Sequence, residues 1–384
     1  MTLNAAIAGV GATPYYYHGT SDPQTLYELI GHAVLAAVKD AGLKITDVDG
    51  MALYASGFEP GLITEQLGIP ELNFSSTISA QGGGSAGILD LAAMAIATGR
   101  AKTVVCLGAC QQSTRRYGLA FAGMAATPDG VWQKAAGLNG PGYNFGLLAR
   151  RHMYKYGTRR EAFAEVVMAS RDYAQTRPTA LRRKPLTLDE YMAAPMLADP
   201  LCRLDFCLET DGAVAFVVTS AERARDLAQR PVYIEASAHG GSRDWGRAFF
   251  WMNMPDDVFA TSGAEHVARR LYAEAGITPK DIDVALIYDH FSPLVIMQLE
   301  DYGFCAKGEG GAFVESGAIR RGGVIPVNPH GGHLSEAYVI GMTHIREAVE
   351  QLRGVAVNQV QGAQFALVSG GPAPIPMSGA ILRN

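Results

Sequence analysis

The feature that most constrains the fold of this chain is an internal duplication. Residues 25–55 read TLYELIGHAVLAAVKDAGLKITDVDGMALYA, and residues 263–293 read GAEHVARRLYAEAGITPKDIDVALIYDHFSP. Each segment has apolar residues at helical spacing, an Ala-Gly stop, two aspartates separated by one residue, and a short apolar strand. Repeated helix–strand units favour an α/β layered fold made of two similar halves.

The rest of the chain continues this alternation of strands and helices. Buried strands are predicted at 5–11, 48–55, 102–110, 210–220, 231–241 and 365–371, and helices at 22–44, 85–101 and 335–354. The chain has 384 residues, more than one hydrophobic core usually serves. We therefore expect an N-terminal half over residues 1–228 and a C-terminal half over residues 229–384.

The alternation is interrupted between about Gln111 and Asp199, where we expect an inserted loop domain. Residues 111–133 look loop-like, and residues 161–176 and 186–194 are typical of surface helices. Many cationic side chains gather in this segment: Arg150, Arg151, Arg159, Arg160, Arg171, Arg177, Arg182, Arg183 and Lys184. They suit either a solvated helical face or the attraction of an anionic ligand such as a phosphorylated cofactor.

Composition excludes several classes of protein. The formal net charge of -5 gives no electrostatic footprint for nucleic acid. No apolar run reaches the length of a membrane span, and the first residues lack the pattern of a secretory signal. The cysteines are odd in number: Cys106, Cys110, Cys202, Cys207 and Cys305. We expect a reduced, cytoplasmic globular protein without a nucleic-acid partner or a membrane span.

The stretch PHGGHLSEAY, from Pro329 to Tyr338, raises three possibilities: a metal site, a turn with histidines nearby, or an active site whose chemistry has changed. A zinc site needs three or four converging ligands. His330 and His333 flank a Gly-Gly turn, and no cysteine or histidine partner stands at regular spacing. We therefore expect no metal.

Several motifs together resemble the thiolase superfamily, in its sterol-carrier-protein thiolase-like branch. They are LYELIGHAVLAAVKDAGL, QGGGSAGIL, LCRLDFCLETDGAVAFVV, YDHFS and NPHGGHLSEAY, and the resemblance covers essentially the whole chain. It implies a thiolase-like five-layered αβαβα fold of two duplicated halves, a homodimer core, and activity on acyl-CoA thioesters.

The departures from the family pattern are as informative as the matches. Aligning Gly84 and Ser85 on the family's C-A-x-G-S pattern places Gln81 at the nucleophilic cysteine, and an amide cannot act as a thiolate. Tyr288 stands where the family's H-D-C-F motif begins with histidine. Tyr338 stands at the histidine that ends the family's G-G-x-x-S-x-G-H motif. The two histidines that would face each other across the pocket are thus replaced by tyrosines.

One subgroup of the branch has these substitutions, the lipid-transfer-protein-type aldolases that shorten steroid side chains. The resemblance implies a retro-aldol cleavage of the Cα–Cβ bond of a β-hydroxyacyl-CoA with no covalent cysteine intermediate. The substrate would be a steroid side chain with a tertiary 17-hydroxyl, and the products a ketone and a short acyl-CoA such as propionyl-CoA. It also implies that Tyr288 and Tyr338 are the catalytic pair.

The roles within this pair stay open. We expect Tyr338 nearer the thioester and Tyr288 at the β-hydroxyl, without assigning base and acid. Two other functions also remain: a thiolase or acyltransferase acting on a non-steroid β-keto acyl-CoA, and an acyl-CoA or lipid carrier with a dead site.

Supporting roles are expected for neighbours of the two tyrosines. Asp289 and Asn328 would orient the backbone, and His330 would tune a tyrosine by a hydrogen bond; His290 is a further supporting residue, although at least one of the histidines is expected to face solvent. Gly331 and Gly332 would let backbone amides approach the thioester. CoA would be part of the substrate and no separate cofactor is expected; the residues that bind CoA stay unknown. The family resemblance also implies an OB-fold acyl-CoA-associated subunit linked to a hydratase, in a heterotetramer.

Overall fold

The computed structural model describes residues 4–54, 58–78, 83–112, 128–138, 140–241, 260–371 and 376–384. Its strands are β1 (Ala5–Ala12), β2 (Tyr16–Tyr17), β3 (Gly50–Tyr54), β4 (Phe74–Ile78), β5 (Thr103–Gln111), β6 (Met196–Ala198), β7 (Leu201–Cys202), β8 (Thr210–Ser220), β9 (Val232–Gly240), β10 (Val284–Leu286), β11 (Phe365–Ser369) and β12 (Met377–Arg383).

The helices alternate with these strands along most of the chain. They are α1 (Leu26–Asp40), α2 (Pro60–Leu67), α3 (Gly87–Ala97), α5 (Pro128–Ala135), α6 (Pro141–Tyr156), α7 (Arg160–Thr176), α8 (Leu188–Met192), α9 (Ala221–Ala224), α10 (Glu265–Ala275), α11 (Ser292–Asp301), α12 (Gly310–Glu315) and α13 (Met342–Arg353). No helix among the described residues is long and apolar enough to cross a membrane.

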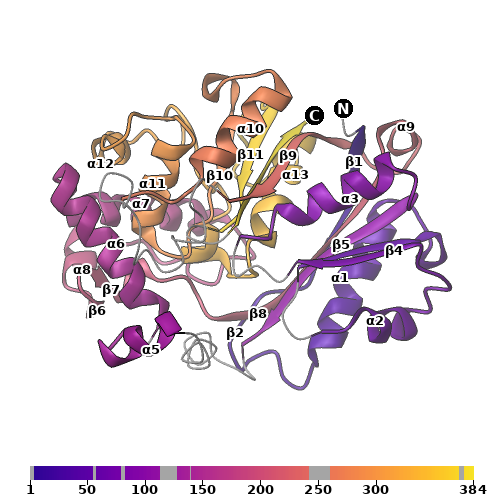
Figure 1. Cartoon of the computed structure of the whole chain (residues 1–384), viewed down its shortest axis with the longest axis horizontal. Coiled ribbons are helices and arrows are strands. Elements are labelled where there is room, and N and C mark those ends of the chain that lie inside the picture. The colour runs from indigo at the N-terminus through magenta and orange to yellow at the C-terminus, as the bar shows by residue number, and fades with distance from the viewer. Residues whose placement is uncertain are drawn as a thin grey trace.

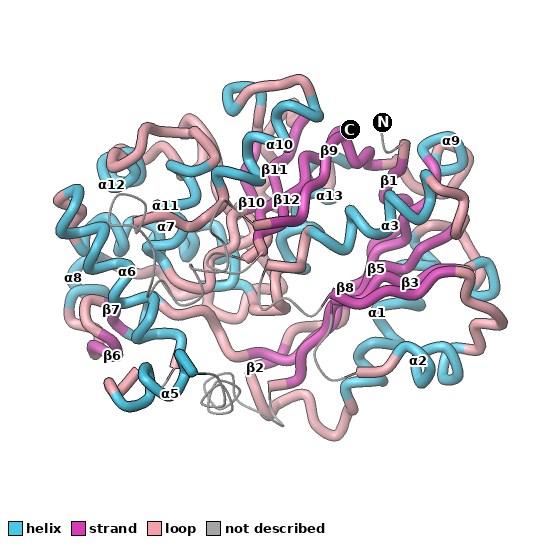
Figure 2. Tube along the Cα trace, viewed as in Figure 1, coloured by secondary structure: helices cyan, strands magenta, loops and turns pink. Residues whose placement is uncertain are grey.

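The long strands hydrogen-bond in the order β10-β11-β12-β9-β1-β8-β5-β3-β4. Figure 2 shows them as two groups, β9 to β12 and β1 with β3, β5 and β8. The groups meet at a short antiparallel contact in which Ala6 faces Tyr233 and Ile7 faces Val232. Within the groups, β3 pairs in parallel with β4 and β5, and β10 pairs in parallel with β11.

Helices form three layers around these two groups of strands. Helices α3 and α13 each contact strands of both groups and therefore lie in the middle layer. On the outer sides, α1 packs on β1, β5 and β8, and α10 packs on β9 and β12. Apolar side chains fill the spaces between layers, including a central core that combines residues of α3, α13 and both groups of strands. The order of layers is thus αβαβα.

The internal duplication extends to side-chain contacts. In the first copy, Asp47 accepts a hydrogen bond from the amide of Lys44 at 2.8 Å, and in the second copy Asp281 accepts one from Thr278 at 2.8 Å. The second aspartate of each pair tethers the next parallel strand. Asp49 accepts from the amide of Thr103 at 2.8 Å at the start of β5, and Asp283 from that of Phe365 at 2.9 Å at the start of β11. The repeated aspartates therefore repeat one structural task.

The insertion is more helical and more buried than its sequence indicates. Within residues 111–133, residues 113–127 lie outside the described part of the chain, and α5 begins at Pro128. Helix α7 is wrongly predicted as a surface helix, because Phe163, Val167 and Tyr173 belong to its buried face. Figure 1 shows α5 to α8 at one end of the molecule, with α7 next to α11 and α12 of the second half.

Two strands and one helix boundary also differ from the expectation. Strand β4 was not predicted, because polar residues fill most of Phe74–Ile78, and neither was β12, the last strand. The helix expected at 335–354 begins only at Met342. Gly341 has φ +88° and Ile340 φ +44°, backbone conformations that a helix cannot contain. Tyr338 therefore lies on a loop that leads into α13.

Candidate active site

The structure brings Tyr288 and Tyr338 together from segments fifty residues apart in the sequence. Tyr288 follows the carboxyl end of β10, and Tyr338 lies on the loop before α13. Their hydroxyl oxygens are 3.0 Å apart and share a hydrogen bond in which either oxygen can donate. The side chains are only 1% and 3% exposed. Two phenols thus share one proton position in a site largely closed to water.

Tyr288 is held through its backbone. Its amide donates to the hydroxyl of Ser369, at the end of β11, at 2.8 Å. Its carbonyl accepts from the side-chain amide of Gln298 on α11 at 2.8 Å, and Ser369 donates to the other end of the same amide at 2.7 Å. These three residues form a closed ring of hydrogen bonds, which fixes the backbone position from which the phenol side chain extends.

Tyr338 is fixed by the first residue of β8. The hydroxyl of Thr210 accepts from the amide of Tyr338 at 3.0 Å and lies 2.7 Å from its carbonyl oxygen, to which it donates. The thiol of Cys110, at the end of β5, also donates to this carbonyl at 3.2 Å. The first half of the chain therefore positions a tyrosine of the second half.

A short π-helical turn, Gly332–Glu336, lies just before Tyr338 and is hydrogen-bonded to the segment of Tyr288. The carboxylate of Asp289 accepts from the amides of His333 at 2.8 Å and Leu334 at 3.3 Å, which ties the turn to the residue after Tyr288. Asp289 thus orients backbone. Asn328 bonds both the amide and the carbonyl of Ile287 at 2.8 Å, just before Tyr288.

The structure gives Gly331 and Gly332 a packing reason that differs from the expected amide contact with a thioester. The amide of Gly331 already donates to the carbonyl of Asn328 at 2.8 Å. A Cβ on Gly332, which has φ +58°, would lie 2.0 Å from a carboxylate oxygen of Asp289. A Cβ on Gly331, which has φ +101°, would lie 2.9 Å from the Cβ of Ala174 on α7. Both glycines let the turn pack closely against neighbouring elements.

The expectation that at least one of the three histidines faces solvent is wrong. His290, His330 and His333 are buried, with exposures of 4%, 0% and 0%. Burial lowers the pKa of His290 to about 3, and burial, reinforced by neighbouring imidazoles, lowers the pKa of His330 and His333 well below the usual value. These three imidazoles are therefore neutral at physiological pH.

His333, not His330, is the histidine beside the tyrosines. Its ring centroid lies 4.5 Å from that of Tyr288 and 5.0 Å from that of Tyr338. His330 packs on His344 instead, with centroids 4.8 Å apart. His290 packs edge-on at 5.3 Å from Tyr288. A rim of neutral aromatic rings therefore surrounds the phenol pair.

Among the described residues, Asp289, His333 and His344 have potential cation ligand atoms within 4.8 Å of one another. The atoms of Asp289 and His344 already make other contacts. Nε2 of His344 lies 2.9 Å from the carbonyl oxygen of Ile287 and 3.1 Å from Asp289 Oδ1. The same Asp289 oxygen accepts from the backbone amide of His333. Neither ring nitrogen of His333 has a hydrogen-bond partner within the part of the chain that the structure describes.

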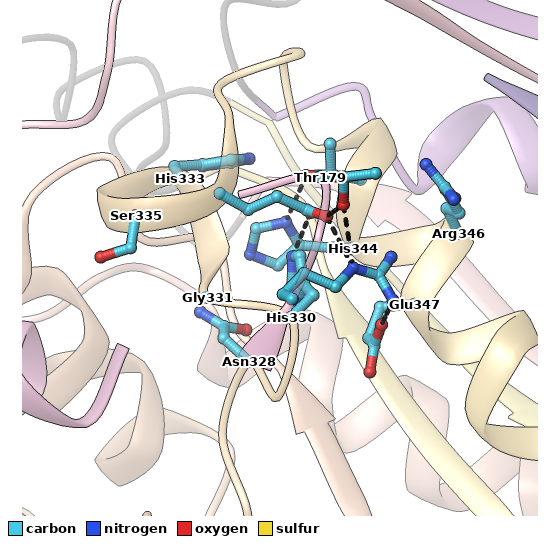
Figure 3. Close-up of polar contacts among 12 residues, drawn as sticks. Thr179, Asn328, His330, Gly331, His333, Ser335, His344, Arg346 and Glu347 are labelled. Carbon is cyan, nitrogen blue, oxygen red and sulfur yellow. Dashed lines mark hydrogen bonds and ion pairs between the residues drawn. The ribbon is translucent and has the colours of Figure 1, made fainter. Parts of the chain in front are cut away.

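A buried ion-pair network supports the turn from the other side (Figure 3). Arg177 is 3% exposed and contacts Glu336 at 2.8 Å, Glu350 at 2.7 Å and Glu347 at 3.3 Å. The carboxylate of Glu336 belongs to the π-helical turn, and its second oxygen lies 3.9 Å from Nε2 of His330. Arg177 is therefore buried among the side chains of three glutamates rather than exposed to a phosphorylated cofactor.

The cysteines near the tyrosine segments are poorly suited to act as nucleophiles. All five cysteines of the chain are free, and burial raises the pKa of Cys110 and of Cys207, the two nearest the tyrosine segments, which disfavours their thiolates. The position expected to replace the nucleophile, Gln81, lies outside the described residues.

Motif reasoning found the two tyrosines but not the residues that hold them. Thr210, Ser369 and Gln298 come from β8, β11 and α11. Thr210 lies within the motif LCRLDFCLETDGAVAFVV, but nothing in that motif indicates that its hydroxyl holds a tyrosine. His344 lies on α13 at a position that reads as an ordinary buried helix residue. Only the layered fold brings these side chains to the site.

Comparison with known proteins agrees with the fold. Residues 250–380 match the family "Thiolase C-terminal domain-like". The chain is 41% identical over 386 residues to a 17-hydroxy-3-oxo-4-pregnene-20-carboxyl-CoA lyase of Mycobacterium tuberculosis, covering 98% of each chain. It is also 41% identical to a steroid side-chain-cleaving aldolase of Thermomonospora curvata, covering 98% of this chain and 97% of that one.

A solved structure described as Ltp2-ChsH2(DUF35) aldolase superposes with a TM-score of 0.92 at 39% identity, covering 100% of this chain and 98% of that one. The five-layered fold expected from the sequence is therefore confirmed.

Proposed function

This chain belongs to the thiolase superfamily, in its branch of steroid side-chain-cleaving aldolases, and we propose that it cleaves the Cα–Cβ bond of a β-hydroxyacyl-CoA by a retro-aldol reaction. The observation that carries the proposal is the 3.0 Å contact between the hydroxyls of Tyr288 and Tyr338, in a site where a thiolate is disfavoured. The enzyme class is carbon–carbon lyase acting on an acyl-CoA thioester.

The proposed substrate is a steroid side chain with a tertiary hydroxyl at ring carbon 17, joined to CoA as a thioester. The names of the relatives support this choice, since one denotes a 17-hydroxy pregnene carboxyl-CoA lyase and the other a steroid side-chain aldolase. The products are a ring ketone and a short acyl-CoA such as propionyl-CoA. Cleavage needs neither water nor free CoA, because substrate and products have the same atoms.

The phenol pair meets the proton demands of this reaction. Tyr288 takes the proton of the β-hydroxyl as the C–O bond becomes a carbonyl and the Cα–Cβ electron pair moves into the thioester enolate. Tyr338 stabilises the enolate oxygen by donating a hydrogen bond, and a phenol proton then completes Cα. Because the two hydroxyls contact each other, the proton gained at one end can be passed to the other. The pair ends the cycle as it began.

The environment of the pair favours a relay between neutral groups over a standing phenolate. The neighbouring imidazoles of His290 and His333 have lowered pKa values, because they are buried. They therefore bring no positive charge that would stabilise a phenolate before the substrate binds. We propose that a phenol releases its proton only as the substrate supplies another one.

Two further parts of the proposal concern the assembly and cofactors. The DUF35 component named with the solved aldolase supports a partner subunit of that type, which we identify with the expected OB-fold acyl-CoA-associated chain linked to a hydratase. We propose that two copies of each chain form a heterotetramer around an aldolase dimer. The mechanism uses no metal ion and no cofactor besides the CoA of the substrate.

The test is to assay Tyr288→Phe and Tyr338→Phe on a synthetic 17-hydroxy steroid acyl-CoA and to identify the products by mass spectrometry. Loss of either phenol is expected to lower kcat/KM by about 10²–10⁴-fold, the usual contribution of a positioned acid or base. Tyr302→Phe is a matched control, because Tyr302 is equally buried but its hydroxyl has no hydrogen-bond partner among the described residues. It should keep full activity.

The same assay separates the other functions left open by the sequence. A thiolase or acyltransferase would need free CoA or an acyl acceptor and would leave an acyl group on the protein. A carrier would bind the substrate without any product. Either result, or full activity in both tyrosine variants, would contradict the retro-aldol proposal.

A further inference from the structure

Ser85 is a buried hydroxyl that the fold does not use. It lies in the turn just before α3 and is 0% exposed. Its oxygen has no hydrogen-bond partner among the described residues. A buried, unpaired polar group costs about 1–3 kcal/mol, so nearly all such groups in native proteins have a partner or a function. The hydroxyl therefore requires an explanation.

The position of Ser85 relative to Tyr288 supplies one. A Cβ placed on Gly341 would lie 2.7 Å from the Ser85 oxygen and 2.9 Å from Cε2 of Tyr288, the ring carbon next to the one that bears the hydroxyl. Ser85 and the reactive end of the Tyr288 ring therefore face the same bare glycine backbone. Gly341 keeps that space open only because it has no side chain, in a conformation, φ +88°, that disfavours any other residue.

The electrostatic setting of Ser85 also suits a developing negative charge. Helix α3 has eleven residues, and its N-cap residue, Ala86, makes no side-chain hydrogen bond to the first turn. The positive end of the helix dipole therefore lies next to the Ser85 hydroxyl with no side-chain cap, and the one acidic residue of the first turn, Asp90, accepts a hydrogen bond from Ser237. The Ser85 hydroxyl and the positive end of the helix dipole both stabilise an anionic oxygen placed near them.

We propose that Ser85 is a third catalytic residue, whose hydroxyl donates a hydrogen bond to the β-oxygen of the bound substrate, on the side of Tyr288. This inference rests on the retro-aldol function and on the assignment of Tyr288 to the β-oxygen. As Tyr288 removes the proton from this oxygen, negative charge develops there before the carbonyl is complete. A fixed donor that has no other partner stabilises that charge without first having to break a bond.

The first test uses two buried serines with opposite surroundings. Ser85→Ala is expected to lower kcat at least 10-fold with little change in KM, while the melting temperature stays the same or rises, because an unpaired hydroxyl is removed. Ser262 is also 0% exposed, but its hydroxyl donates to Asp301, the last residue of α11, at 2.6 Å. Ser262→Ala should lower the melting temperature and leave kcat unchanged.

The second test identifies the substrate oxygen. Binding of the 17-hydroxy acyl-CoA and of its 17-deoxy analogue is measured by calorimetry with Tyr338→Phe, in which turnover is expected to be slow, and with the Tyr338→Phe, Ser85→Ala double variant. Removal of Ser85 should weaken binding of the hydroxy compound about 5- to 10-fold, the value of one hydrogen bond, and leave the deoxy analogue within about 2-fold.

The outcomes distinguish this inference from the proposed function. A wild-type protein that does not cleave the substrate contradicts the retro-aldol function, and the binding comparison still decides the role of Ser85. Cleavage by the wild-type protein with an unchanged Ser85→Ala kcat, or equal weakening of both compounds, contradicts the role of Ser85 alone. Loss of the folded state in Ser85→Ala would also contradict it, because the hydroxyl would then be structural.

Discussion

At the scale of single residues, the chemistry of a phenol explains why two tyrosines suit a site that in related families uses imidazole. A neutral phenol donates and accepts through one oxygen, whereas a neutral imidazole donates at one nitrogen and accepts at the other. Tyr288 and Tyr338 can therefore reverse the direction of their shared hydrogen bond by rotating two O–H bonds. A proton can enter the pair at one ring and leave at the other.

Asp289 is the residue whose replacement should disturb this pair most without touching the substrate. Its carboxylate accepts from the amides of His333 and Leu334 and faces His344 at 3.1 Å. In Asp289→Asn, one of the two carboxylate oxygens becomes an NH2 group. This group would face a backbone N–H and could not accept its hydrogen bond. We expect a loss of about 2–3 kcal/mol in the free energy of unfolding and at least a 10-fold loss in kcat/KM. Denaturant unfolding and steady-state kinetics measure the two effects.

Asp283, in the second copy of the internal duplication, offers a control for this variant. Asp283 also accepts two backbone amides, those of Gln364 and Phe365, but at the start of β11 and half-exposed. Asp283→Asn should cost about 1 kcal/mol of stability and no activity. Equal kinetic effects in the two variants would show that Asp289 acts only through global stability.

The sequence predicted that Tyr288 and Tyr338 lie in one site, but it did not predict the residues around them. Tyr288 and Tyr338 stand out because each occupies a motif position where a different residue is expected. Ser85 and Thr210 give no such signal, since buried serine and threonine are ordinary core residues and only tertiary contacts bring them to the tyrosines. The burial of His330 and His333 was missed because a polar, glycine-rich stretch reads as an exposed turn.

At the scale of secondary-structure elements, the decisive feature is the loop that separates the π-helical turn from α13. Ile340 is β-branched and has φ +44°, a conformation that costs energy and persists only where the surroundings impose it. Apolar residues continue through this loop at helical spacing, so the sequence predicts an unbroken helix. The actual break places Tyr338 opposite Tyr288, which a helix beginning at Ser335 would not do.

The two ends of α13 allow a matched test of this loop. Gly341 and Gly354 flank the helix with φ of +88° and +77°, but a Cβ would collide with Ser85 and Tyr288 at Gly341 and meet nothing within 4 Å at Gly354. Gly354→Ala should cost about 1 kcal/mol of stability and leave kcat/KM unchanged. Gly341→Ala should cost more stability and lower kcat/KM at least 10-fold. Wild-type kinetics in Gly341→Ala would refute close packing here.

The ion-pair network on α13 predicts a pH dependence of stability. Burial raises the pKa of Glu347 to about 8 from 4.5, with Arg177 acting in the opposite direction. The folded state thus keeps a proton that the unfolded state loses above about pH 4.5, so stability falls as the pH rises toward 8. Glu347→Gln has no proton to lose in this range. As the pH rises, the unfolding free energy of the variant should therefore increase relative to that of the wild type, by up to about 1.4 kcal/mol per pH unit.

Glu350 on the same helix should show the opposite sign. Burial opposes its charge, but Arg346 and Arg177 outweigh burial and hold the pKa of Glu350 below its usual range. Its stabilising charge is present above the unfolded-state pKa and is lost as the pH falls through the folded-state pKa. Glu350→Gln should therefore lose stability at neutral pH and lose less in acid. Denaturant unfolding between pH 4 and 8 measures both variants, and parallel curves would contradict the assignment.

At the scale of the whole molecule, both halves of the chain contribute residues to the tyrosine site. Thr210 and Cys110 of the first half hold Tyr338, while Tyr288 and α13 belong to the second. The duplication visible in the sequence predicted a layered α/β fold of two similar halves, and the family resemblance implied the order of the layers. It was not enough to predict how α7 of the insertion packs under the π-helical turn, where the hydroxyl of Ser170 donates to the carbonyl of Gly331. That contact depends on a long insertion without internal repetition.

The assembly of the chain with other subunits also belongs to the scale of the whole molecule. Its full length matches the aldolase chain of the Ltp2-ChsH2(DUF35) structure, so the surfaces of that chain have counterparts here. We expect the isolated chain to be a dimer by native mass spectrometry and to join a DUF35-type partner as two plus two chains. Cleavage should be at least about 10-fold faster in the complex, because we propose that the partner surface helps to hold the thioester at Tyr338. An isolated chain that stays monomeric and cleaves at the full rate would show that both phenols operate without any partner surface.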